Sequence, residues 1–186
     1  MPCRGWGISI TDRIIDLFHG LFGWTSTLKS EDYGFMLYGQ LLVAHNLVRW
    51  IVLVAGIIAL GMAFTGWSGH KPMEPRVRRW GALFVAALDL QFLLGLILYF
   101  LVSPITNLAF QNMAAAMKDH EMRFFTVEHT TYMLIAIIAA HVGSALSRKG
   151  RTDTRKYRGA AIGYGISLLV ILAGIPWWRP LFRWSS

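Results

Sequence analysis

The stretch RFFTVEHTTYMLIAIIAAHVGSALSRKG, residues 123–150, decides the fold. It is long enough to cross a bilayer, because about 20 apolar residues at about 1.5 Å per residue span a hydrocarbon core of about 30 Å. It nevertheless carries three ionisable side chains, Glu128, His129 and His141. Such groups are costly in lipid and usually turn inward to a partner, an ion path or a cofactor. These three residues are therefore the first candidates for a functional role.

The composition of the whole chain supports a membrane protein. Its 186 residues are 55% hydrophobic, with a mean hydropathy of +0.46, which is more apolar than a soluble domain of this size requires. Its single cysteine, Cys3, excludes an internal disulfide framework and a cysteine-rich zinc or iron–sulfur site. The net charge of +8 does not indicate nucleic-acid binding, since Lys and Arg gather in the loops of membrane proteins. We predict one all-α integral membrane domain in contact with lipid and with no nucleic-acid partner.

Three further apolar segments accompany the first. The four spans are expected at residues 35–64, 80–102, 124–146 and 159–175. Their short connections make consecutive helices antiparallel neighbours, which predicts an up-down four-helix bundle over residues 35–178. Residues 1–34 carry apolar side chains at helical spacing and are predicted to form an amphipathic interfacial helix, and residues 179–186 a short tail.

The distribution of basic residues predicts the orientation. Lys and Arg are concentrated in residues 65–79 and 147–158, whereas residues 103–123 balance two basic side chains with two acidic ones. Cytoplasmic loops of membrane proteins carry an excess of Lys and Arg. We therefore expect a multi-pass membrane protein with both termini on the outer side.

The first span contains a histidine and an arginine on one face. His45 and Arg49 lie four residues apart, so both are expected to point into the bundle. Arg49 lies near the middle of its span, where facing lipid would cost at least about 2.5 kcal/mol. Asp89 of the second span, two residues before Gln91, is the expected anionic partner, because buried charges are normally paired.

His45 and His129 have the placement of two axial haem ligands. Their levels differ by about 7 Å at 1.5 Å per residue, and the first and third spans of an up-down bundle are diagonal. Diagonal histidines can hold haem b between two neutral imidazoles. Arg49 could then contact a haem propionate, and Glu128 or Gln40 could accept the second N–H of an imidazole.

Other interpretations of the same residues stay open. The two histidines could stabilise helix packing without any cofactor, through hydrogen bonds to Gln40, Glu128, Gln91 or backbone. A quinone or a chlorophyll-type tetrapyrrole could also be bound, since one imidazole suffices for a chlorophyll magnesium. His141 is about 18 Å deeper than His129 and rotated by about 120°, so it cannot serve the same site and is expected to be a packing histidine.

Four short blocks carry a resemblance to a known family. They are HNLVRW (45–50), QFLLGLILYF (91–100), MKDHEMRFFTVEHTTYMLIAI (117–137) and IPW (175–177). With them the chain resembles a family of small four-span bacterial membrane proteins, found in Bacteroidetes and related phyla and labelled cytochrome b-like. In the pattern of that family the residues matching His45, Arg49, Glu128 and His129 recur. A histidine commonly stands in the place of Asp89, where this chain departs from the pattern.

The resemblance implies an electron-transfer subunit rather than an enzyme. The chain has no Gly-rich phosphate loop, no HExxH and no cysteine ligand pair, so no independent catalytic activity is expected. We expect a cytochrome b-like subunit of a larger respiratory or photosynthetic complex, with other membrane subunits or a quinone as partners. The alternative is a non-catalytic accessory or scaffold subunit that makes only lipid or pigment contacts.

Overall fold

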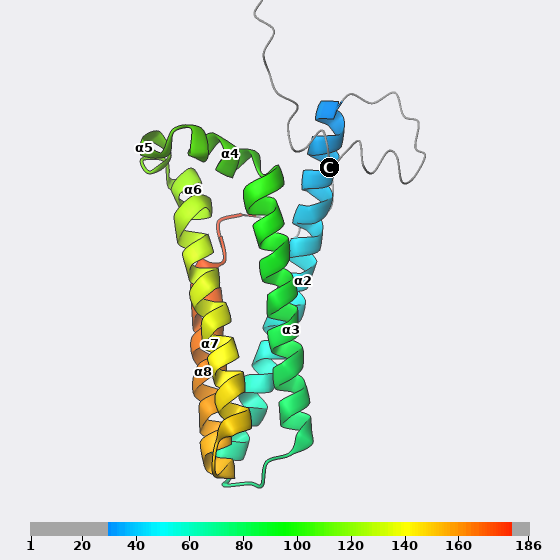
Figure 1. Ribbon diagram of the computed structural model, residues 1–186, viewed down its shortest axis with the longest axis vertical. Coiled ribbons are helices and arrows are strands. Elements are labelled where there is room, and N and C mark those ends of the chain that lie inside the picture. Colours follow the sequence, from blue (N-terminus) through cyan, green and yellow to red (C-terminus); the bar gives the residue numbers. More distant parts are fainter. Residues whose placement is uncertain (1–29, 180–186) are drawn as a thin grey trace, which may run out of the picture.

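The computed structural model describes residues 30–179, which are helical and contain no strand. The predicted amphipathic helix of residues 1–34 and the tail of residues 179–186 lie almost entirely outside these described residues, and positions 30–34 belong to the first long helix. Four long helices dominate the fold (Figure 1). They are α2 (Ser30–Ser68), α3 (Pro75–Ile97), α7 (His129–Lys149) and α8 (Asp153–Gly174).

The four long helices confirm the predicted spans by length and composition. The segments long and apolar enough to cross a membrane are Met36–Ser68, Pro75–Val102, His120–Lys149 and Asp153–Gly174. Many large apolar side chains on them face outward, with Ile57 63% exposed and Leu169 69% exposed. Lipid-facing helices require such a surface, since lipid tails are as apolar as these side chains. The fold is therefore that expected of a multi-pass membrane protein.

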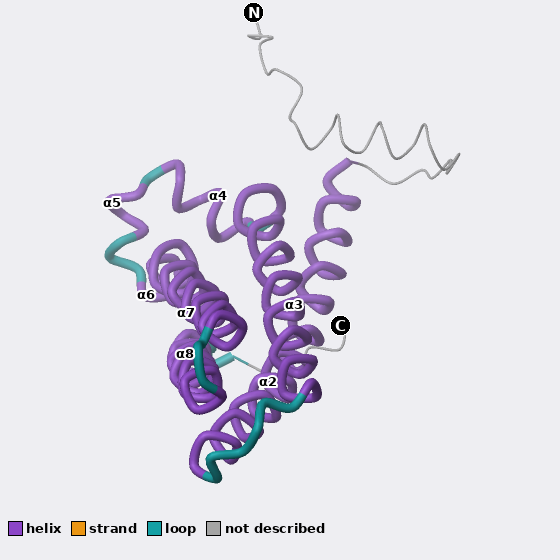
Figure 2. Tube along the Cα trace, turned by 60° about the horizontal axis from the view of Figure 1, so that its bottom comes forward, coloured by secondary structure: helices purple, strands orange, loops and turns teal. Residues whose placement is uncertain are grey.

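Each long helix lies beside two others. Helix α2 packs against α3 and α8, α3 packs against α7, and α7 packs against α8 (Figures 1 and 2). Helices α2 and α7 consequently face each other across the centre. Helices α7 and α8 approach most closely, because a Cβ atom on Gly163 would lie 2.3 Å from the Cα atom of Gly143. Small residues allow this contact between two backbones.

The two ends of the helices differ. At one end, here named the basic end, residues 69–74 join α2 to α3 and residues 150–152 join α7 to α8. Tyr157 holds this end together, because its hydroxyl donates to the carbonyl oxygen of Pro72 at 3.0 Å. The opposite end, here named the α4 end, is covered by three short helices. They are α4 (Pro104–Gln111), α5 (Met113–Ala116) and α6 (His120–Arg123).

Two π-helical turns lie next to the α4 end. The turn η1 (Leu98–Val102) extends α3, and the turn η2 (Phe124–Glu128) leads directly into α7. The hydroxyl of Tyr99 in η1 donates to the carbonyl oxygen of Thr126 in η2 at 2.9 Å. Single π turns inside helices are often found at functional sites.

Candidate functional site

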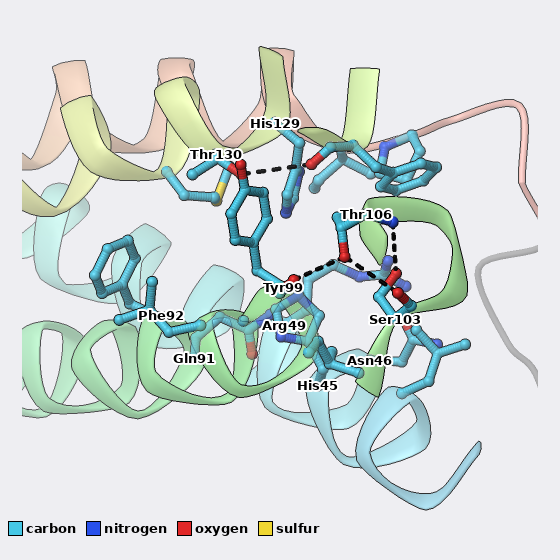
Figure 3. Close-up of a pocket in the computed structure, with 18 of the residues that line it drawn as sticks. His45, Asn46, Arg49, Gln91, Phe92, Tyr99, Ser103, Thr106, His129 and Thr130 are labelled. Carbon is cyan, nitrogen blue, oxygen red and sulfur yellow. Dashed lines mark hydrogen bonds between the residues drawn. The ribbon is translucent and has the colours of Figure 1, made fainter. Parts of the chain in front are cut away.

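A cavity of about 160 Å³ lies between the helices near the α4 end, and it is neither fully enclosed nor flat. Its wall contains His45 and Arg49 from α2, Gln91 from α3 and His129 from α7 (Figure 3). Arg179, from the segment after α8, also lines it. The three residues that the sequence proposed as cofactor contacts therefore line one cavity. Apolar side chains make up much of the remaining wall, namely Leu42, Val52, Leu88, Phe92, Leu96, Ile171 and Ile175.

The two histidines face each other from diagonal helices. The ring centres of His45 and His129 are 6.3 Å apart, and the ring planes are inclined by 66°. Two imidazoles that bind one metal ion from opposite sides have ring centres about 6 Å apart, with a metal–nitrogen distance of about 2.0 Å on each side and roughly 1.1 Å more to each ring centre. The observed separation fits a pair of axial ligands.

The orientation of His129 is fixed by a backbone group. Its Nδ1 atom lies 2.8 Å from the carbonyl oxygen of Gly174. A carbonyl oxygen only accepts, so Nδ1 carries the proton, and Nε2 of the neutral ring keeps a free lone pair. Metal-binding histidines usually donate their second ring N–H in this way. The geometry thus prepares His129 for coordination through Nε2.

The acceptor for His129 is a backbone carbonyl, a kind of partner that the sequence offered only for the packing interpretation; the cofactor interpretation named Glu128 or Gln40. Glu128 accepts instead from Nε of Arg123 at 2.8 Å, and Gln40 is an exposed residue of α2. The Gly174 carbonyl can come close because a Cβ atom at Gly174 would lie 2.6 Å from Cε of Met133. Every residue has a backbone carbonyl, so residue types do not indicate which carbonyl will accept a given hydrogen bond. The glycine at the end of α8, where α8 meets α7, was the available clue.

Two polar atoms in the cavity wall are buried without a partner. Among the described residues, neither Nδ1 of His45 nor Oε1 of Gln91 has a hydrogen-bond partner. The ring of His45 lies close to the backbone of α3, since a Cβ atom at Gly95 would be in van der Waals contact with its Cε1 atom at 3.4 Å. Buried polar atoms are nearly always satisfied, so unsatisfied ones beside a cavity indicate room for a ligand.

The charge of the cavity wall is positive. Among the described residues that line it, Arg49 and Arg179 are cationic and none is an Asp or Glu. Arg179 also forms an ion pair with Glu121 and lies over the ring of Phe125, 4.5 Å from its centre. Two guanidinium groups beside an apolar cavity favour a ligand that carries carboxylate or phosphate groups.

Asp89 has a different partner from the predicted one. Its Oδ1 atom lies 2.8 Å from Nε2 of His141, and neither residue lines the cavity. The predicted pairing of Arg49 with Asp89 is therefore replaced by an Asp89–His141 pair between α3 and α7. The expectation that His141 packs inside the bundle is also corrected, because its side chain is half exposed.

The fold and the cavity together define a helical protein with four membrane-length helices and a histidine pair between two of them. No family model matches the chain, and no curated protein and no solved structure is significantly similar to it.

Proposed function

We propose that this protein is a cytochrome b-like electron-transfer subunit of a larger respiratory or photosynthetic membrane complex, and that it binds haem b between His45 and His129. The observation that carries the proposal is the 6.3 Å separation of the two ring centres on diagonal helices. The hydrogen bond from His129 to Gly174, which leaves Nε2 unprotonated, supports it.

The cavity suits the chemistry of haem b. Haem b combines a metal with two axial positions, an apolar macrocycle and two carboxylates, and the wall offers two imidazoles, apolar side chains and two arginines. An apolar cavity of about 150 Å³ holds one benzene molecule, so the whole cavity of about 160 Å³ holds about one ring. The helices around it would have to move apart to take a whole porphyrin.

The residues of the chain would bind and orient the cofactor. When bound, haem b takes up and releases one electron at a time. His45 and His129 would each present a neutral ring nitrogen, and Gly174 would keep the second ring in its tautomer. Arg49 and Arg179 would offset the charge of carboxylates. No proton transfer by these side chains is needed, which agrees with a subunit that has no catalytic activity of its own.

The proposal includes the membrane arrangement. The helices would form an up-down bundle in the bacterial inner membrane, with the basic end in the cytoplasm and both termini outside, because Lys and Arg favour the cytoplasmic side. The α4 end, and with it the histidine pair, would then lie near the outer face. A partner subunit or a quinone could exchange electrons there.

Two alternatives have an observation in their favour. A quinone head group is about the size of the cavity, and it would use the arginines as hydrogen-bond donors. An accessory or scaffold subunit without a cofactor would use the exposed apolar faces of the helices to contact other subunits. Both differ from haem binding in having no metal at the histidine pair.

An optical spectrum of the purified full chain tests the proposal. We expect a sharp reduced-minus-oxidised α-band and a haem b pyridine extract, both lost in His45→Ala and in His129→Ala. His70→Asn is the control, because His70 is exposed in the connection at the basic end and asparagine tolerates its positive φ of 49°, so the band should be unchanged. A protein with intact helical circular dichroism but no tetrapyrrole would overturn the proposal, and a magnesium pigment in the extract would replace haem by chlorophyll.

A further inference from the structure

The Asp89–His141 pair lies on the outside of the helices. Asp89 Oδ1 and His141 Nε2 are 2.8 Å apart, and the two side chains are 47% and 51% exposed. Asp89 is at the midpoint of the apolar segment Pro75–Val102, and His141 lies about 12 Å before the end of α7 at 1.5 Å per residue. The pair therefore faces the hydrocarbon of the bilayer rather than its surface.

Each side chain of this pair has a second polar atom that forms no hydrogen bond among the described residues. Within residues 30–179, no hydrogen bond reaches Oδ2 of Asp89 or Nδ1 of His141. Ionisable side chains at this depth are costly when they face lipid, and they normally meet another polar group. A further molecule is therefore expected to cover this part of α3 and α7.

The membrane restricts the protonation state of the pair. A carboxylate beside a neutral imidazole would place one net charge in hydrocarbon, which is the most costly form. The two uncharged alternatives are an ion pair between carboxylate and imidazolium, and a neutral acid beside a neutral imidazole. Each of these leaves one donor and one acceptor free. They are Nδ1–H and Oδ2 in the ion pair and in the neutral pair with the acid proton on Oδ1, and Oδ2–H and Nδ1 in the other neutral pair.

A surface with one free donor and one free acceptor is complementary to a copy of itself. In a two-fold symmetric contact, the Nδ1–H of His141 can donate to the partner subunit's Asp89 while the partner subunit's His141 donates to Asp89. We propose that the protein forms a homodimer through the face of α3 and α7 that carries this pair. Exposed apolar side chains of the same helices adjoin it, namely Leu90, Leu93, Ile138 and Val142.

The mass of the full chain in a mild detergent tests this dimer. Sedimentation equilibrium should give twice the chain mass of 21.0 kDa. The double variant Asp89→Leu with His141→Leu removes both polar groups at once, so no unpaired group remains in the folded subunit. We expect the dimer dissociation constant to rise by at least about tenfold in this variant, with helical circular dichroism unchanged. An unchanged dimer constant would overturn the proposal.

Cysteine cross-linking in membranes tests whether the dimer forms through this face of α3 and α7. In a Cys3→Ala background, Leu93→Cys lies one helical turn from Asp89, and Ile57→Cys on the exposed face of α2 is the matched control. Oxidation should form a disulfide between two copies at position 93 and should leave position 57 largely without cross-links. Three outcomes would each exclude the homodimer. They are equal cross-linking at both positions, no cross-linked dimer at either position, and cross-linking of position 93 only to another protein. None of these readouts depends on a bound cofactor.

Discussion

The Nδ1 atom of His129 and the carbonyl oxygen of Gly174 are 2.8 Å apart, although the two residues are 45 positions apart in the chain. This bond links the start of α7 to the last residue of α8. It can form because Gly174 has no side chain between the two helices. The tautomer of a candidate metal ligand thus depends on the packing of a glycine in another helix.

A substitution at Gly174, which does not itself line the cavity, should weaken cofactor binding. In Gly174→Ala the new Cβ atom would lie 2.6 Å from Cε of Met133 and 2.9 Å from Cβ of Tyr132. The flexible end of Met133 can move aside, but Cβ of Tyr132 is fixed to the backbone of α7, so α8 and with it the Gly174 carbonyl must shift. Loss of such a supporting contact typically costs 10-fold to 100-fold in metal affinity, and we expect at least about tenfold weaker haem binding in titrations of the apoprotein.

The control for this prediction lies on the same helix. A Cβ atom at Gly165 would have its nearest neighbour at 3.7 Å, an ordinary contact, so Gly165→Ala should bind haem like the unaltered protein. If both alanine variants bind equally well, the Gly174 carbonyl does not orient the ligand.

The charge of Arg49 should raise the reduction potential of a bound haem. A positive charge near the iron favours the reduced form, and a unit charge about 10 Å away at an effective dielectric constant of about 20 contributes roughly 1.7 kcal/mol. We expect Arg49→Gln to lower the midpoint potential by an amount on the order of 70 mV in a redox titration. Arg49→Lys keeps the charge and should retain most of the potential, so equal shifts in both variants would exclude an electrostatic role.

The contact between Gly163 and Gly143 should be the least tolerant packing position. The atoms that a Cβ on Gly163 would meet are backbone atoms of α7, at 2.3 Å from Gly143 and 2.8 Å from the carbonyl oxygen of Ala139. Backbone cannot move aside as a flexible side chain can, so Gly163→Ala should destabilise the protein by about 1–3 kcal/mol. Thermal melting followed by circular dichroism measures the loss, with Gly165→Ala as the reference. A melting temperature equal to that of Gly165→Ala would show that α7 and α8 pack less closely.

The sequence was sufficient to predict the four long helices and one face of the candidate site. Length and hydropathy specify four membrane-length helices, and the four-residue spacing of His45 and Arg49 specifies a shared helical face. The partner of Asp89 was predicted wrongly, because it depends on the rotation of α3 about its own axis. Hydropathy constrains that rotation weakly in a segment that is apolar on every side.

The particular contacts made by backbone groups also could not be predicted from the sequence. The bond from His129 to the Gly174 carbonyl and the two π turns involve groups that every residue possesses, so residue types do not reveal them. The amphipathic helix predicted in residues 1–34 stays a prediction, since residues 1–29 lie outside the described part of the chain.

The π turn η2 immediately before His129 has a consequence for how the chain tolerates insertions and deletions. Successive residues of an α-helix are rotated by about 100°, so removing one residue from Phe124–Glu128 would turn α6 by that angle relative to α7. The carbonyl of Thr126 would then lose its place beside the Tyr99 hydroxyl. Inserting or deleting one residue here would therefore change the direction in which the chain leaves α7. The short helices of the α4 end would then no longer lie beside the histidine pair.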